Sequence, residues 1–226
     1  MKRRREEMGK GKSELRLAME GLSFFSSGDG KEDQEQVQEQ PRSSTMDLLC
    51  VSKQLIHVLD EIGPTLLVLR QDIQQNVQRL EELHAKDPSK YVSLTAIVTE
   101  EVEEGTSKKT NSCTRAIIWL ARSINFSKYL LERLVKTPDS SLEEVVEEAY
   151  RCTLKPWHGW ISSAAYKVAL KLVPEKEIFI ALLIGNCQEF EDLAEDVKIL
   201  TDTVKPLLEE IDAILAKHNL DKLKCS

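Results

Sequence analysis

The stretch IHVLDEIGPTLLVLRQDIQQNVQRL (56–80) carries the clearest structural pattern in the chain. Its apolar residues recur at steps of three and four, which places them on one face of an α-helix: Ile56, Leu59, Ile62, Leu66, Leu69, Ile73, Val77 and Leu80. Gly63-Pro64 interrupts this face, and proline fits the first turn of a helix but not its interior. The stretch therefore predicts two consecutive helices, starting near Met46, with a bend at residues 63–64.

Helical periodicity continues through the rest of the chain. It predicts helices at about 94–102, 112–135, 140–154, 160–172, 174–184, 187–204 and 206–218, the last two separated at Pro206. Ser140 and Glu143 have the spacing of a capping box. The segment 112–135 is apolar on more than one side and is expected at the centre of the fold. No alternating strand pattern of useful length is present, so we expect an all-α fold of about eight helices in packed layers.

The first 44 residues differ from this pattern. They are polar and charged, as in KRRREE (2–7) and SSGDGKEDQEQVQEQPRSS (26–44), and contain too little apolar surface to offset the entropy of ordering. We expect a disordered extension at 1–44, with one short helix at most, and a single domain at 45–226. The KRRR cluster fits a nuclear address or a membrane contact, but a solvated basic tail explains it as simply.

Composition excludes several classes of protein. The net charge is −7 and the pI is about 5.3, whereas nucleic-acid binding needs many Lys and Arg side chains on one face. The longest apolar run, 178–184, is far shorter than the roughly 20 residues of a spanning helix. No secretory signal follows the charged start, so we expect a cytoplasmic protein. We also expect it to be a monomer. Five scattered cysteines without a CxxC pair predict neither a disulfide framework nor a zinc site.

Enzyme signatures are missing as well. The chain contains no GxSxG, HExxH, GxxxxGK[ST] or GxGxxG motif. We therefore expect no catalytic residues, no cofactor and no metal site, and a protein that is not an enzyme.

Two polar triplets stand out on the helices. Asp72, Asn76 and Arg79 follow one another at i, i+4 and i+7, which places them in one row on one helix face. Taken alone, such a row is more often a solvated surface. The same spacing recurs at Arg115, Trp119 and Arg122 on the most apolar helix.

The two triplets and His158 together contain the groups that bind a sugar. Hydroxyl groups need both donors and acceptors, and the apolar face of a pyranose stacks on an aromatic ring. Trp119 alone would more often be a core residue, and His158 alone a packing residue. The spacing permits their convergence without proving it.

Three segments resemble the glycolipid transfer protein family, in order and spacing. DEIGPTLLVLRQDIQQNVQRLE (60–81) matches the first half of the family signature, with its D-x-x-x-N-x-x-[KR] row at Asp72, Asn76 and Arg79. SCTRAIIWLARSINF (112–126) is similar to the central helix, with its tryptophan at Trp119. YRCTLKPWHGWISSAAYKVALKLVP (150–174) is similar to the helix that carries the recognition histidine, here His158. The similarity extends from about residue 46 to near the C-terminus.

This resemblance implies a two-layer helical sandwich with a headgroup site above a hydrocarbon tunnel, and a role in moving a sphingolipid between membranes. It implies that Asp72 accepts from the ceramide amide and a sugar hydroxyl, and that Asn76 and Arg79 bind further headgroup oxygens. Trp119 would stack under the first sugar, and His158 would donate to the ceramide carbonyl. Tunnel candidates, for which ordinary core packing is an equal alternative, are Val58, Leu59, Ile62, Leu66, Phe126, Phe179 and Leu182.

A membrane contact is expected on the helix after His158. Trp160, Lys167 and Lys171 lie on one helical stripe that, with Trp157, offers interfacial indoles beside cations. The alternative is a buried Trp160, because tryptophan is usually largely covered.

The headgroup is expected to be a sugar. In the family branch that carries ceramide-1-phosphate, two arginines four residues apart bind the phosphate, whereas this chain has Arg115 and Trp119 at those positions. Trp119 supplies a stacking surface and removes one of the two cations. We expect a glycosylceramide, neutral or anionic, with ceramide-1-phosphate as the alternative because Arg115 is present. A lipid sensor and a helical adaptor without a ligand are the other readings that remain open.

Overall fold

The computed structural model describes residues 44–184 and 190–224. The extension expected at 1–44 lies almost entirely outside them. Within the described residues the chain forms eight α-helices, two 3₁₀ turns and no strand, which confirms the all-α prediction. The helices are α2 (Ser44–Ile62), α3 (Leu67–Lys86), α4 (Leu94–Glu103), α5 (Cys113–Lys136), α6 (Leu142–Thr153), α7 (Trp160–Leu170), α8 (Lys176–Ile184) and α9 (Phe190–Lys217).

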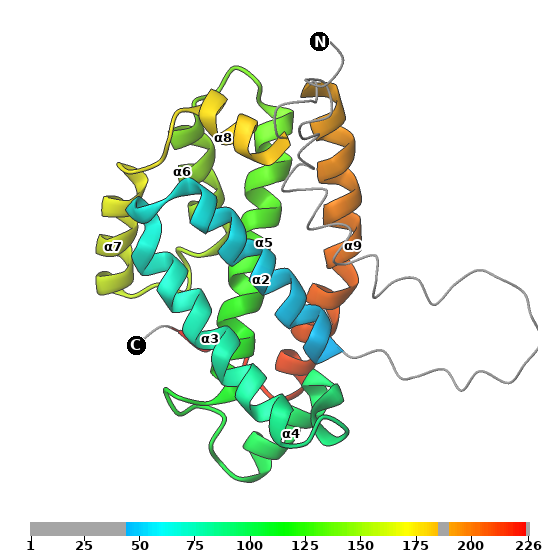
Figure 1. The fold of residues 1–226 in the computed structure, drawn as a ribbon. Helices are drawn as coiled ribbons and strands as arrows, with labels where there is room; N and C mark the ends of the chain where they lie inside the picture. Colours follow the sequence, from blue (N-terminus) through cyan, green and yellow to red (C-terminus); the bar gives the residue numbers. More distant parts are fainter. Residues whose placement is uncertain (1–43, 185–189, 225–226) are drawn as a thin grey trace, which may run out of the picture.

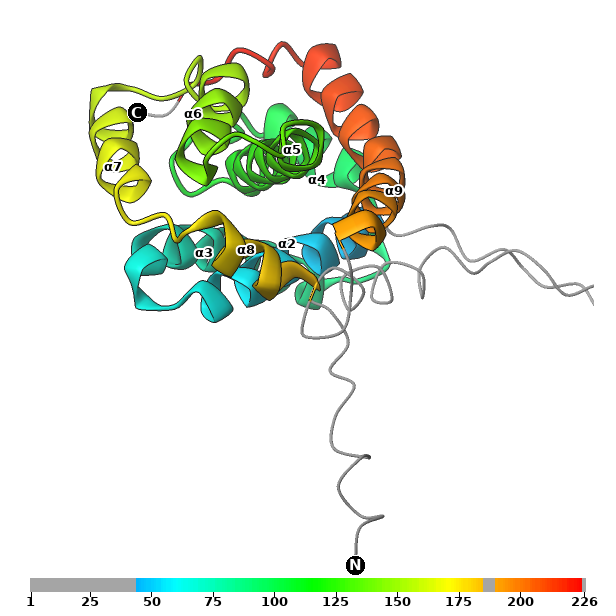
Figure 2. The same ribbon diagram turned by 90° about the horizontal axis from the view of Figure 1, so that it is seen from above.

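The helices pack as two layers around α5, as Figures 1 and 2 show from two directions. In Figure 2, α2, α3 and α8 lie on one side, and α5 lies with α6 and α4 on the other. α9 and α7 flank the layers at opposite ends of this view. α5 contacts α2, α3, α4, α6 and α9, so the helix that the sequence predicts at the centre of the fold is central.

The bend between α2 and α3 is built from the residues that predicted it. Gly63 has φ 97°, a backbone conformation that side chains with a Cβ rarely adopt, and Pro64 begins a 3₁₀ turn, Pro64–Leu66. Arg70 donates from Nε and Nη2 to the two carboxylate oxygens of Asp60, at 2.7 and 3.2 Å, across the bend. The guanidinium–carboxylate fork holds α3 at a fixed angle to α2.

The start of α5 is fixed by hydrogen bonds rather than by periodicity. Ser112 accepts from the Arg115 amide at 3.1 Å as the N-cap. Glu101 of α4 accepts from the amides of Cys113 and Thr114, each at 2.7 Å. These bonds satisfy amides that the first helical turn leaves without partners, and a carboxylate is favourable at a helix N-terminus.

Several expected boundaries differ from the structure. α7 ends at Leu170 and α8 begins at Lys176, each two residues inside the expected range, so Pro174 precedes α8. The capping box at the start of α6 is formed by Ser141 and Glu144, one residue later than predicted, because the Ser141 side chain accepts from the Glu144 amide. The two helices expected on either side of Pro206 are one continuous helix, α9. Pro206 lies on the exposed face, where the carbonyl that loses its helical partner remains open to solvent.

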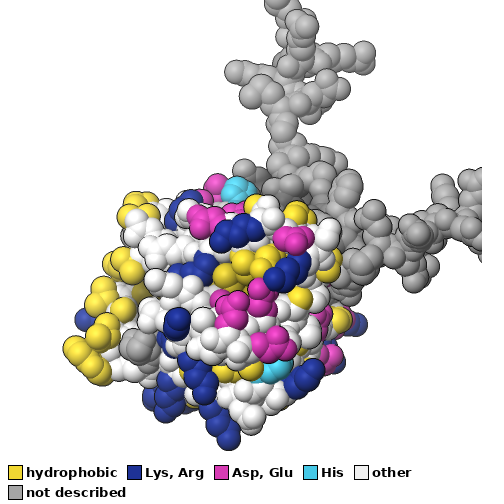
Figure 3. All heavy atoms as spheres, turned by 90° about the horizontal axis from the view of Figure 1, so that it is seen from below, with side chains coloured by type: hydrophobic (Ala, Val, Ile, Leu, Met, Phe, Trp, Pro, Cys, Tyr) yellow, Lys and Arg dark blue, Asp and Glu magenta, His cyan; other side chains and the backbone are white. Residues whose placement is uncertain are grey.

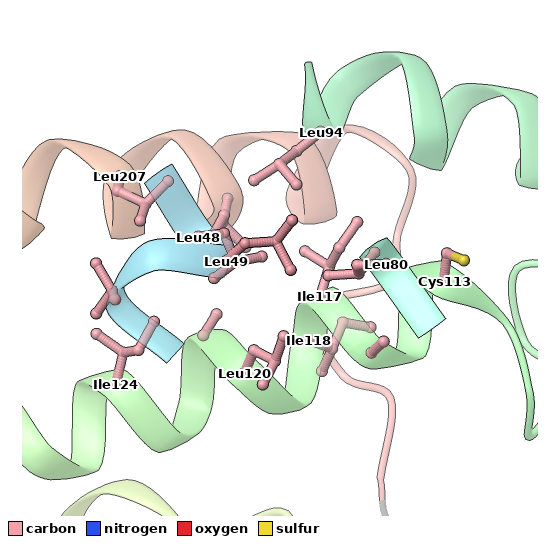
Figure 4. Packing of buried hydrophobic residues seen from close by; sticks show 14 of the residues in the cluster. Leu48, Leu49, Leu80, Leu94, Cys113, Ile117, Ile118, Leu120, Ile124 and Leu207 are labelled. Carbon is pink, nitrogen blue, oxygen red and sulfur yellow. The ribbon is translucent and has the colours of Figure 1, made fainter. Parts of the chain in front are cut away.

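Buried apolar side chains form two clusters. The main cluster joins α2, α3, α4, the first half of α5 and the second half of α9. Figure 4 shows part of it, with side chains of α2, α3 and α5 pointing toward one another. Its most completely buried members include Leu48, Leu80, Leu94, Ile117, Ile118, Leu120, Ile211 and Leu220. The second cluster joins the second half of α5 to α6, α8 and the first half of α9 through Leu130, Leu131, Leu134, Leu142, Val145, Ala149, Phe179, Leu183, Leu193 and Val197.

Candidate functional site: a headgroup surface across α3, α5 and the α6–α7 loop

The polar row on α3 is internally connected. The Asn76 side chain is buried and donates from Nδ2 to the Asp72 carbonyl at 2.9 Å, while Arg79 donates to Asn76 Oδ1 at 3.3 Å. The row lies on the helix that packs along α5, and Cys113 Sγ of α5 donates to the Arg79 carbonyl at 3.8 Å. Asn76 and Arg79 are therefore held in place. The Asp72 carboxylate makes no hydrogen bond within the described part of the chain.

The environment of Asp72 disfavours its charge. The residue keeps exposed surface, yet the protein around the carboxyl removes water from it and raises its pKa above the ordinary 3.8, with a smaller opposing effect from Arg79. A carboxyl group that is partly dehydrated but still reachable is suited to accept hydrogen bonds from a ligand.

The loop between α6 and α7 places His158 beside Trp119. Backbone bonds from Trp157 N and His158 N to the Leu154 carbonyl, at 3.0 and 3.2 Å, turn the chain after α6. The His158 ring lies 5.8 Å from the ring of Trp119 and 5.5 Å from that of Tyr150. Its Nδ1 atom is buried and has no hydrogen-bond partner among the described residues.

The surroundings of His158 favour its neutral form. Burial and, second, the positive charge of Arg122 lower the pKa of His158 below the ordinary 6.5. A neutral imidazole with a buried, unpartnered nitrogen can donate to or accept from one polar atom of a ligand.

Arg122 organises the other side of this surface. Its guanidinium carbon lies 4.9 Å from the centre of the Trp119 ring and 4.1 Å from that of Trp157. These are cation–π distances, so one cation contacts both indoles. Trp157, expected at the membrane, thus has its ring in this stack and is only half-buried.

Two tyrosines extend the aromatic contacts toward α7. Tyr150 of α6 stacks on Tyr166 of α7 with ring centres 3.4 Å apart and donates to Ser163 Oγ at 3.3 Å. Desolvation, first among the causes, raises the pKa of Tyr166 to about 12. Aromatic rings are therefore in contact in a continuous series from Tyr166 on α7 through Tyr150 and His158 to Trp119.

The structure divides the expected headgroup residues into two connected groups. Asp72, Asn76 and Arg79 form one group on α3, and Trp119 and His158 form the other on α5 and the α6–α7 loop. Arg115 is buried and donates to the Lys224 carbonyl at 3.4 Å, which links it to neither group. The α3 and α5 groups lie on two helices packed against each other.

The expected membrane contacts on α7 are exposed. Trp160 is 82% exposed, and Lys167 and Lys171 are exposed as well. Further apolar side chains are exposed on and next to α7 and at the start of α3: Ile161, Val168, Leu172, Leu67, Val68 and Leu69. Figure 3 shows hydrophobic side chains gathered along the edge on which α7 lies in Figure 1. A buried Trp160, the alternative considered above, does not occur.

The tunnel candidates lie in different surroundings. Leu59 and Leu66 belong to or pack on the main cluster, and Phe179 and Phe126 belong to or pack on the second cluster. Ile62 packs against both clusters. Val58 and Leu182 are partly buried and belong to neither cluster. A lipid-lining role for these seven residues stays a prediction.

The sequence did not predict that Tyr150, Tyr166 and the residues after α9 contribute to this surface. Arg122 was visible only as the third member of a triplet. Its i+3 spacing from Trp119 was a usable signal, because residues three apart on a helix are neighbours. The tyrosines have no comparable signal, since their stacking depends on how α7 folds back on α6.

Across the described residues, no helix is both long and apolar enough to cross a membrane. Nor does any group of three or more His, Cys, Asp or Glu side chains there have the arrangement of a metal site.

Comparison with known proteins agrees with this geometry. The family model "Glycolipid transfer protein (GLTP)" matches residues 43–185. Glycolipid transfer protein 2 of Arabidopsis thaliana is 43% identical over 227 residues, covering 99% of both chains. Glycolipid transfer protein 3 of the same plant is 46% identical over 177 residues, covering 78% of this chain and 76% of its own.

Solved structures share the fold. The GLTP-fold structure of FAPP2, reported to select simple glycosphingolipids, has a TM-score of 0.74 at 26% identity and covers 90% of this chain and 99% of its own. Human ceramide-1-phosphate transfer protein with its lipid has a TM-score of 0.76 at 21% identity and covers 94% and 100%. The chain is thus a helical lipid transfer protein and not an enzyme. It belongs to the glycolipid transfer protein family, which confirms the resemblance seen in the three segments.

Proposed function

We propose that this protein binds a glycosphingolipid, most simply a glycosylceramide, and carries it between membranes as a monomer in the cytoplasm. Residues 45–226 would form the lipid-binding domain. The observation that carries the proposal is the ring pair of Trp119 and His158, 5.8 Å apart, with Trp119 on α5, the helix that packs against α3 and its polar row. The Trp119 ring offers a stacking surface, His158 Nδ1 has no hydrogen-bond partner among the described residues, and Asp72 on α3 adds an accessible carboxyl group.

Each proposed headgroup residue would bind the part of the lipid that matches its chemistry. Arg122 lies over the Trp119 ring, so the sugar would stack on the remaining indole surface. Asp72 would accept from the ceramide amide N–H and a sugar hydroxyl, and His158 Nδ1 would bond to the ceramide carbonyl. A buried polar group without a partner costs about 1–3 kcal/mol, so both ceramide amide groups need such partners. Asn76 and Arg79 would bind further headgroup oxygens.

The hydrocarbon chains would enter beside the second cluster. Exposing about 30 methylenes to water costs more than about 20 kcal/mol at ~0.8 kcal/mol each, so a carrier must cover them with apolar side chains. Ile62, at the bend, packs on both clusters, Phe179 belongs to the second cluster and Phe126 packs against it, so this apolar region reaches the bend. The exposed apolar edge of α7, with Trp160, would touch the membrane during loading.

A vesicle-to-vesicle transfer assay tests the proposal directly. Donor vesicles contain fluorescent glucosylceramide or fluorescent ceramide-1-phosphate, and acceptor vesicles contain neither. We expect glucosylceramide to move faster and Trp119→Ala to abolish the difference. Faster ceramide-1-phosphate transfer with a harmless Trp119→Ala would contradict the choice of headgroup.

Ceramide-1-phosphate is the second candidate, because Arg115 offers a cation four residues before Trp119. Native mass spectrometry of co-purified lipid identifies the ligand independently of the assay. Tight binding with negligible transfer would indicate a lipid sensor, and a protein that never carries lipid would indicate an adaptor.

A further inference from the structure

The chain after α9 is directed onto α5 by a helix-ending motif. Leu220 N donates to the Leu215 carbonyl at 2.9 Å and Asn219 N to the Ala216 carbonyl at 3.2 Å, the two bonds of a Schellman motif. Asn219 takes the left-handed conformation that the motif requires, with φ 56°. Leu220 then lies fully inside the main cluster. The direction of the following residues is therefore fixed by the helix end and by a buried leucine.

Three backbone carbonyls of this segment accept hydrogen bonds from arginines of α5. Arg122 donates from Nη1 to Leu223 O at 2.8 Å and from Nη2 to Asp221 O at 3.2 Å. Arg115 donates from Nη2 to Lys224 O at 3.4 Å. We call Asp221, Leu223 and Lys224 the carbonyl strap. The Leu223 side chain packs against the main cluster and anchors it.

The strap engages the two cations that flank the proposed sugar-binding indole. Arg115 precedes Trp119 by four residues and Arg122 follows it by three, so all three lie on one side of α5. A phosphate on ceramide needs guanidinium donors aimed at its oxygens in a fork, and the strap uses donors of both arginines. A sugar that stacks on Trp119 has no such requirement.

We propose that the carbonyl strap is a specificity element, which holds Arg115 and Arg122 against backbone carbonyls and so favours a glycosylated headgroup over a phosphate on ceramide. This inference rests on the proposed function, because it assumes that the headgroup binds beside Trp119.

The test compares two glycine variants of the full chain. Leu223→Gly removes the anchor of the strap, whereas Lys222→Gly adds the same backbone freedom next to it and removes only an exposed side chain. Transfer of glucosylceramide and of ceramide-1-phosphate is measured for each variant and for the wild type. We expect Leu223→Gly to shift the ratio of the two rates toward ceramide-1-phosphate by about tenfold, the size of one charge-assisted hydrogen bond, and Lys222→Gly to keep the wild-type ratio.

A second variant keeps the test decisive if Leu223→Gly does not fold. Arg122→Lys keeps the charge but cannot reach two carbonyls with one fork, so it should shift the ratio in the same direction by a smaller factor. An unchanged ratio in folded Leu223→Gly and Arg122→Lys, or an equal shift in Lys222→Gly, would overturn the role of the strap. A wild-type protein that transfers neither lipid, or only ceramide-1-phosphate, would instead refute the proposed function on which the strap depends.

Discussion

The main cluster and the second cluster differ in size and in the share of their apolar side chains that is only partly buried. In the main cluster Leu48, Leu80 and Leu94 are 0% exposed, and Ile117, Ile118 and Leu120 are 1% exposed. The second cluster is smaller and is bordered by partly buried side chains of α5, α6 and α8: Phe126, Tyr129, Val135, Val146, Ile180 and Ile184. In α8 itself only Phe179 and Leu183 are buried.

The difference separates a scaffold from an adaptable region. The main cluster fixes α3 and the first half of α5, and these helices carry the polar row and the Arg115–Trp119–Arg122 triplet. Within the described residues the second cluster has 10 buried and 9 partly buried side chains, against 25 and 10 in the main cluster, so its side chains can part at lower cost than close-packed ones. A carrier needs both properties, a rigid headgroup surface and an apolar region that admits chains.

Two leucines of α5 test this comparison most strongly. Leu120 and Leu134 are 1% and 0% exposed, but Leu120 belongs to the main cluster and Leu134 to the second. We expect Leu120→Ala to lower the free energy of unfolding by about 3–5 kcal/mol and Leu134→Ala by about 2–3 kcal/mol, because the second site collapses more easily around the lost volume.

Urea denaturation of the lipid-free protein measures both values. Lipid should restore stability in Leu134→Ala more than in Leu120→Ala, since acyl chains would fill the vacated space. Equal losses with equal restoration would mean that the two clusters are one uniform core.

Asp72→Val separates binding from stability. The variant removes the proposed acceptor for the ceramide amide, and we expect lipid binding to weaken at least about tenfold. The pKa of Asp72 is raised, mainly by desolvation, so its charge opposes folding once the pH exceeds that raised value. The melting temperature of Asp72→Val should therefore equal or exceed that of the wild type at neutral pH.

Circular dichroism and differential scanning calorimetry check the fold of this variant. Asp72→Asn is the matched control, because it also removes the charge but retains a polar side chain. Lost helicity or a much lower melting temperature would make Asp72 a structural residue instead.

His158 predicts a pH dependence of stability. Its pKa is lowered by burial and by Arg122, so below about pH 6.5 the unfolded chain binds this proton more readily than the folded protein does. The contribution of neutral His158 is present above that pH and is lost as the pH falls through its folded pKa. Denaturation midpoints of the wild type should fall more steeply than those of His158→Gln between about pH 7 and pH 5. Parallel curves would show that His158 does not titrate differently on folding.

Trp160→Ala should have the smallest effect on stability and a clear effect on membranes. Trp160 is 82% exposed, so we expect a stability change within about 0.5 kcal/mol. The blue shift of tryptophan fluorescence on adding vesicles should largely disappear, and Trp157→Ala should reduce it less because Trp157 stacks on Arg122. Ile199→Ala, which removes an exposed apolar side chain on α9, is the control. A blue shift that persists in both tryptophan variants would exclude α7 as the docking surface.

Local patterns in the sequence predicted most of the helices, because 3.6-residue periodicity and turn residues such as Gly63-Pro64 act over short distances. They failed at Pro206, where an exposed position in a well-packed helix outweighs the lost hydrogen bond. The polar row on α3 and Trp119 were found from spacing and resemblance. The contact of Arg122 with Leu223 was not, since residues about one hundred positions apart leave no common local pattern.

Helix α7 has no buried residue, and its aromatic link to the body of the protein is the stack of Tyr166 on Tyr150. In thermodynamic terms, its opening free energy is set by one ring pair and a few hydrogen bonds, not by the stability of either cluster. Amide hydrogens of α7 should therefore exchange through a local opening long before those of α5, which exchange with global unfolding. The helix proposed to meet the membrane can therefore detach and dock again while the helices of the main cluster stay folded.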